Sequence, residues 1–286
     1  MCLQANISAA LLSNVDEFNN GERGDQMVRE MTEHKVTYND TMRTAFSYDK
    51  TVCGYLMAQI DKRGIDFKDV LYSPSLVNKY IPTNMDLLCG DHYVEIIAKR
   101  LEGERSLPPA RRGPWRSVTQ FLKVFVDGVV AAGNRKTIYT FFIDTNPSFS
   151  VYTELAVLSA NRLIVPINAD DFSRAAVKSM LYLLYGIEID NKRQIKYEHL
   201  KEYEFWYRAK EEGLILLQIH LVINNKITSY KGVAKAFKAK ESEIVSHIQT
   251  VKLKEPTRFV DHPQILCELN DLHTVAVQCL HCHTIF

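Results

Sequence analysis

The strongest pattern of hydrophobic and polar positions lies between residues 137 and 171. An apolar run at 138–143, interrupted only by Thr140, is too continuous for a half-exposed strand and predicts a strand buried on both faces. Residues 150–160 space their apolar side chains at helical intervals, and the apolar run 163–167 predicts a second buried strand. Strand, helix and strand in this order predict one right-handed crossover unit of a parallel sheet.

Further elements of both kinds flank this unit. The pattern predicts helices at 46–60, 92–100, 115–132, 173–185, 197–213 and 231–240, the last with solvent-facing lysines, and strands at 86–88 and 214–223. In the helix 173–185 the positions expected to face inward are Ala175, Ala176, Met180 and Leu184. Gly186 stands where that helix should end. Alternating strands and helices predict an α/β fold with a doubly wound, mostly parallel sheet.

The composition is that of an ordinary globular chain. Its 286 residues, 46% hydrophobic and 24% charged, predict a single domain over 1–286. Lys and Arg total 35 against 34 acidic residues, so no global field attracts nucleic acid or an anionic membrane. The sequence shows neither a membrane-length apolar stretch nor a signal-peptide pattern, which predicts a cytoplasmic protein without a membrane span. The six irregularly placed cysteines predict reduced thiols.

Two local clusters carry candidate chemistry outside the central unit. The basic cluster Arg105, Arg111, Arg112 and Arg116 could contact DNA phosphates without reading sequence, and a solvated loop is the alternative that we favour. The carboxyl end contains Cys279-x-x-Cys282 with His281 and His283, which are zinc-ligand types. Such sites usually need a second ligand pair, and no regularly spaced pair follows from the sequence. Zinc or redox chemistry is therefore the weaker interpretation of this tail.

The first candidate for chemistry is Asp144, directly after the run 138–143. Ligands of open parallel sheets bind outside the carboxyl ends of the strands. In nucleotide hydrolases an aspartate in this position holds Mg²⁺ or its water beside the phosphates. The alternative is a carboxylate that begins a helix or turn, which an apolar run followed by Asp does not by itself exclude.

Two stretches, FFIDTNPSF at 141–149 and TELAVLSANRLIVPINADDFS at 153–173, resemble the ParA/MinD family of deviant-Walker ATPases. The family positions for a strand-ending aspartate, a Pro-Ser turn and a strand-ending proline are matched by Asp144, Pro147, Ser148 and Pro166. Gln4, Ala5 and Asn6 match the end of the family's Asp-x-Asp-Pro-Gln-x-Asn segment. The resemblance extends from Gln4 to about Val277, with a variable helical insertion at about 14–80.

The resemblance implies a sheet of the P-loop NTPase type, with ATP and Mg²⁺ as cofactors. It implies that Asp144 holds Mg²⁺ through water, that Gln4 is a second remnant of the nucleotide site, and that Asn224 reads the adenine edge. For Asn224 a turn-forming role remains the alternative. Family members form homodimers, act with a partition-type partner protein in plasmid partition or chromosome segregation, and some bind non-specific DNA.

The sequence departs from the family at the phosphate site. A phosphate cradle needs Gly-rich backbone amides, a lysine and a Ser/Thr hydroxyl, and no Gly-x-x-x-x-Gly-Lys-Ser/Thr motif occurs in the 286 residues. The nearest glycine pair, Gly21 and Gly24, has no such lysine. We therefore expect a ParA-like ATPase fragment, truncated at both ends and inactive as written. The alternative is a catalytically dead interaction or scaffold protein that retains the family's dimer or partner surface.

Overall fold

The computed structural model describes residues 6–12, 50–90, 93–106, 113–145, 148–168, 170–189, 198–227, 235–261 and 266–270. The chain divides into two compact units, one made of Met1–Ser159 and His273–Phe286 and the other of Ala160–Leu272. The described parts combine helices with a small parallel sheet, so the fold is mixed α/β, as the sequence predicts. The expectation of a single domain stays a prediction.

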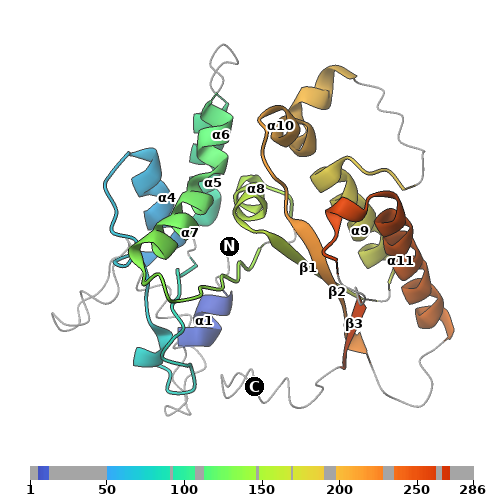
Figure 1. The fold of residues 1–286 in the computed structure, drawn as a ribbon, viewed down its shortest axis with the longest axis horizontal. Coiled ribbons are helices and arrows are strands. Elements are labelled where there is room, and N and C mark those ends of the chain that lie inside the picture. Colours follow the sequence, from blue (N-terminus) through green and yellow to red (C-terminus); the bar gives the residue numbers. More distant parts are fainter. Residues whose placement is uncertain are drawn as a thin grey trace. The chain divides into compact units, whose positions relative to one another are not determined.

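The described part of the first unit is helical (Figure 1). Its helices are α1 (Asn6–Leu12), α4 (Val52–Ile60), η2 (Pro74–Leu76), α5 (Val94–Arg105), α6 (Pro114–Thr119), α7 (Phe121–Ala132) and α8 (Val151–Ser159). Tyr55 lies at the centre of the core, with its ring 5.1 Å from that of Phe125 and its hydroxyl donating to the Phe121 carbonyl at 2.6 Å. Leu101 of α5 and Leu155 of α8 are also buried there.

The predicted strand at 138–143 does not form, and this part of the prediction is wrong. These residues belong to no strand, and Ile138 and Phe142 are 93% and 84% exposed. Phe141 and Ile143 pack against the helical core of the first unit, so the run has one covered face instead of two. An apolar run sets an extended preference, but a strand also needs a neighbour for its backbone groups. The predicted strand 86–88 is likewise limited to isolated bridges, Leu87 with Tyr72 and Cys89 with Thr51.

The second unit contains the parallel sheet. Its strands are β1 (Arg162–Ile167), β2 (Gln218–Ile227) and β3 (Leu266–Asn270), in the order β1-β2-β3 with both pairs parallel. Between β1 and β2 lie α9 (Asp171–Tyr185), η3 (Glu198–Tyr203) and α10 (Phe205–Glu211), and between β2 and β3 lie α11 (Lys235–Lys254) and η4 (Pro256–Arg258). Figure 1 shows α9 and α11 side by side on one face of this sheet. Both connections are therefore helical crossovers, as parallel strands require.

Several predicted elements of this unit are confirmed with shifted details. The strand 163–167 corresponds to β1, but the expectation that it is buried is wrong, because only Ile167 is buried and Ile164 is 45% exposed. The strand predicted at 214–223 begins at Gln218 and continues to Ile227, and the helix predicted at 197–213 is divided into η3 and α10. Across the first unit, α8 occupies its predicted range, whereas the helix predicted at 115–132 is divided into α6 and α7.

The helix α9 ends where predicted, but its buried face differs from the predicted one. Gly186 follows its last residue with φ 70° and ψ 21°, a left-handed conformation that glycine adopts without strain. A Cβ atom at this position would lie 2.7 Å from the Trp206 ring. The buried face consists of Val177, Leu181, Leu184 and Tyr185, whereas Ala175 and Ala176 are exposed. On α11 the matching buried positions are Ile244, Ile248 and Val251. Both helices therefore present larger side chains to the core at helical spacing.

Candidate functional site

Asn224 occupies the carboxyl-terminal half of the central strand β2. It pairs in register with Ile167, the last residue of β1, and with Glu268 of β3. Its side chain is 2% exposed, and the amide Nδ2 donates to Oε1 of Glu241 on α11 at 2.7 Å. Asn224 therefore lies within a strand and not in a turn, so the turn-forming alternative is wrong.

The helix α9 begins a few residues after the carboxyl end of β1, the same end of the strand at which Ile167 pairs with Asn224. Asp170 is the N-cap, with its carboxylate accepting from the Ser173 amide at 2.6 Å, and the Ser173 hydroxyl accepts from the Asn168 amide at 3.0 Å. The bond from the Ser173 amide satisfies a backbone donor that the first turn of a helix leaves open, and the bond from the Asn168 amide ties the preceding chain to that turn. The Asp170 carboxylate is therefore committed to holding the helix start.

Asp171 is the carboxylate of this segment that faces another helix. It accepts from Nζ of Lys240 at 2.6 Å and pairs with Arg174 at 3.1 Å, and Arg174 also pairs with Glu243. The hydrogen bond from Lys240 lowers the pKa of Asp171, and the hydrogen bond from Arg174 lowers the pKa of Glu243. The expectation that Lys240 only faces solvent is therefore wrong.

Asp171 and Asn224 are linked through neighbouring residues of one helix. Lys240, which binds Asp171, directly precedes Glu241, which binds Asn224. The arrangement brings two carboxylates, an amide and an ammonium group to the carboxyl edge of the sheet, where ligands of parallel sheets bind. We name this set of side chains, Asp171, Asn224, Lys240 and Glu241, the edge cluster. Of this cluster the sequence analysis names Asn224 as a site residue. It does not name Glu241, because no sequence signal pairs a strand residue with a helix residue 17 positions later.

Asp144 belongs to the first unit and is exposed at the end of the extended run, not at the tip of a strand. No group of three or more His, Cys, Asp or Glu side chains that could hold a metal ion occurs among the described residues. Mg²⁺ bound through one carboxylate also needs substrate phosphates and waters, so Asp144 alone does not constitute a magnesium site. Because 138–143 forms no strand, Asp144 does not end a strand of the described sheet that contains Asn224.

Several other predicted site residues lie outside the described residues. They are Gln4, Arg111, Arg112, Cys279, His281, Cys282 and His283. Arg105, by contrast, is described at the end of α5, where its guanidinium pairs with Glu102 and with Glu154 of α8. With 14% of its side chain exposed, Arg105 belongs neither to a solvated loop nor to a DNA-contacting surface.

No helix in the described part of the chain is long and apolar enough to cross a membrane. The chain was also compared with models of protein families, with curated proteins and with solved structures. None of the three comparisons gives a match.

Proposed function

We propose that this chain is a ParA-like protein of a partition or positioning system, and that the edge cluster forms the base side of its nucleotide site. The observation that carries the proposal is Asn224, a buried amide near the carboxyl end of the central strand of a parallel sheet. The resemblance at 141–149 and 153–173 supports the same family, and with it a P-loop NTPase type of sheet, a homodimer and a partition-type partner protein.

An asparagine amide carries two N–H donors and one carbonyl acceptor, which suits the edge of adenine. In Asn224 the nitrogen already donates to Glu241, so one of its two N–H groups is used. The base would meet the remaining N–H and the carbonyl. Glu241 would then act as a positioning residue that fixes which way the amide is turned.

We expect the affinity for ATP-Mg²⁺ to be weak. Phosphoryl groups are held by loop amides, lysines and a metal-binding hydroxyl, and the 286 residues contain no motif that supplies them. Each missing charge-assisted contact costs about 1.5 to 3 kcal/mol. Losing two or three of them moves a micromolar site to about millimolar or weaker.

A second candidate is an interaction or scaffold protein without nucleotide chemistry. It is favoured by the fact that the polar groups of the edge cluster already bind one another: Glu241 binds Asn224, and Lys240 binds Asp171. In this case the same side chains fasten α11 and α9 to the sheet. The two candidates therefore differ in whether Asn224 contacts a ligand or only holds the fold.

Calorimetric titration of the full chain with ATP-Mg²⁺ separates the two candidates. We expect millimolar binding that Asn224→Ala weakens about tenfold, the loss of roughly one hydrogen bond. The matched control is Asn161→Ala, which changes an exposed asparagine directly before β1, at the end of β1 opposite to Ile167. It should leave the affinity unchanged. Circular dichroism checks that each variant is folded. Equal affinity in all three proteins, or no binding by the wild type, would contradict the nucleotide role and favour the scaffold protein, the second candidate.

A third variant tests the phosphate side. Asp144→Ala should change the weak affinity little, because an exposed carboxylate without a phosphate cradle contributes little attraction to an anionic ligand. Micromolar binding by the wild type that Asp144→Ala abolishes would instead show a phosphate site that uses this residue. Phosphate release measured on the same samples should stay at the level of a protein-free control.

A further inference from the structure

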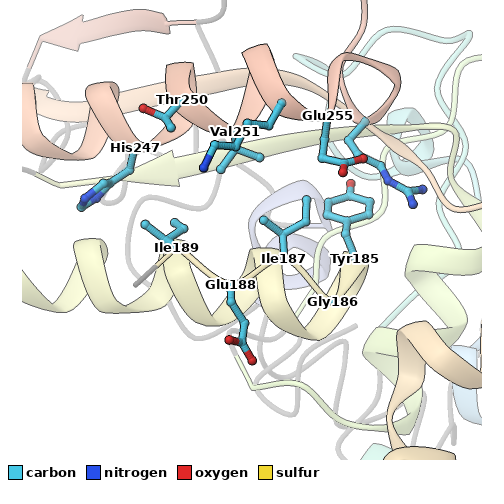
Figure 2. Close-up of a pocket in the computed structure, with 11 residues that line it drawn as sticks. Tyr185, Gly186, Ile187, Glu188, Ile189, His247, Thr250, Val251 and Glu255 are labelled. Atoms are coloured by element: carbon cyan, nitrogen blue, oxygen red, sulfur yellow. The ribbon is translucent and has the colours of Figure 1, made fainter. Parts of the chain in front are cut away.

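A pocket of about 310 Å³ lies in the second unit, between the end of α9 and the carboxyl-terminal half of α11. Figure 2 shows Tyr185, Ile187 and Ile189 directed from the α9 side towards α11, whereas Glu188 points to the opposite side. Val251 of α11 is buried and adds to the apolar lining. The volume is at the small end of the range for small-molecule sites. One wall of the pocket is therefore apolar and shaped for a compact group.

The remaining lining includes two cations. Lys254 is the last residue of α11 and Arg258 the last residue of η4. Neither forms an ion pair with an acidic side chain in the part of the chain that the structure describes. The lining also contains two acidic residues, Glu188 and Glu255. Because the Glu188 side chain points away from α11, the two cations are balanced on this side by Glu255 alone.

Arg258 is held in place at the pocket but is incompletely bonded. Its Cζ lies 5.4 Å from the centre of the Tyr185 ring, which is buried and faces the guanidinium. Burial raises the pKa of the Tyr185 phenol, whose hydroxyl donates to the Leu217 carbonyl at 3.0 Å. The Arg258 Nε atom is buried and has no hydrogen-bond partner among the described residues. A buried donor of this kind destabilises the fold until an acceptor reaches it.

The ends of the neighbouring helices do not provide that acceptor. Two carbonyls in the last turn of α9 are bonded within the chain, because the Gly186 amide donates to Tyr182 and the Ile187 amide donates to Leu181. At the end of α11 the Glu255 amide donates to the Val251 carbonyl. These carbonyls thus accept from the chain's own amides, and no described residue accepts a hydrogen bond from Arg258 Nε.

We propose that this pocket binds a small ligand with an oxyanion group, which accepts hydrogen bonds from the Arg258 guanidinium and Lys254 Nζ while its compact apolar body lies against Ile187 and Val251. A carboxylate and a phosphate monoester share the chemistry that the two cations recognise. The site is separate from the edge cluster. It adjoins Leu217, which directly precedes β2, whereas Asn224 lies seven residues after Leu217, at about 3.3 Å per residue.

The test is a calorimetric titration of the full chain with inorganic phosphate and with benzoate, at constant ionic strength. We expect saturable binding of at least one anion, and the tighter one identifies the oxyanion type. Lys254→Ala removes an exposed side chain and should weaken binding about tenfold, which corresponds to one charge-assisted contact. Lys210→Ala, which removes an exposed lysine from α10 of the same unit, is the matched control and should bind like the wild type.

Arg258→Lys keeps the charge but removes the forked donors of the guanidinium, and it should also weaken binding about tenfold while the near-ultraviolet circular dichroism stays unchanged. Asn224→Ala should leave anion binding intact, which separates this site from the proposed nucleotide role. The proposal is overturned if the wild type binds neither anion saturably. It is equally overturned if Lys254→Ala binds as tightly as the wild type, or if Lys210→Ala weakens binding as much as Lys254→Ala does.

Discussion

Replacing Asn224 by aspartate should turn a stabilising contact into a repulsive one. In the wild type the buried amide of Asn224 donates to the Glu241 carboxylate at 2.7 Å and joins β2 to α11. Asn224→Asp keeps the size of the side chain but places a second carboxylate at this distance. Asn224→Ala removes the contact without adding a charge, so the two variants separate a lost hydrogen bond from like-charge repulsion.

The magnitudes follow from burial and distance. A hydrogen bond to a charged acceptor contributes about 1.5 to 3 kcal/mol, so Asn224→Ala should lower the free energy of unfolding by that amount. Two like charges about 4 Å apart repel by about 4 kcal/mol at the effective dielectric constant of a protein surface, and Glu241 is half-buried. Asn224→Asp should therefore cost about 3 to 5 kcal/mol at pH 7, a large part of the roughly 5 to 15 kcal/mol that stabilise a typical domain.

The effect of Asn224→Asp should depend on pH. Burial and the neighbouring carboxylate raise the pKa of the new carboxyl group in the folded state above its unfolded value of about 3.9. The folded state then binds a proton more tightly than the unfolded state does. The loss of stability caused by Asn224→Asp should therefore be full at pH values above the raised pKa. It should disappear as the pH falls towards the pKa of the unfolded state, because the protonated acid then donates to Glu241 as the amide did.

Urea unfolding followed by Trp206 fluorescence in a Trp115→Phe background reports on the second unit. The double variant Asn224→Asp with Glu241→Gln is the decisive control, because it restores a donor–acceptor pair and should recover most of the lost stability. The reasoning is refuted if Asn224→Asp is as stable as Asn224→Ala at pH 7. It is also refuted if Glu241→Gln gives no recovery.

Three further predictions test other parts of the structure by urea unfolding and light scattering. Glu154→Ala should lower the free energy of unfolding by about 2 to 4 kcal/mol, because it leaves the mostly buried Arg105 with one partner. The same change at the more exposed Glu102 should cost less than half as much, and equal losses would contradict this. Gly186→Ala should cost about 1 to 3 kcal/mol, since it combines a left-handed backbone with a clash against an aromatic ring, and an unchanged unfolding midpoint would contradict this. Phe142→Ser should reduce aggregation without loss of stability, whereas Phe141→Ser should destabilise the first unit. A loss of stability in both variants would contradict this and support a strand that is covered on both faces.

The elements that the sequence predicts best depend on local periodicity. The helix α8, the strand β1 and the end of α9 at Gly186 lie where the pattern of apolar positions and the special backbone freedom of glycine place them. Each of these depends on neighbours within about one or two turns of chain, which a single sequence displays directly. The parallel, α/β character follows from the alternation of such elements.

The tertiary structure alone decided which faces are covered and which polar groups meet. The run 138–143 has the residues of a buried strand but finds no strand to pair with in the described chain, so one of its faces stays exposed. In α9 the core selected Val177 and Leu181 over the neighbouring alanines. Asn224 and Glu241 meet only because α11 returns along β2. Burial and pairing are properties of three-dimensional neighbours, and residues distant in sequence supply them.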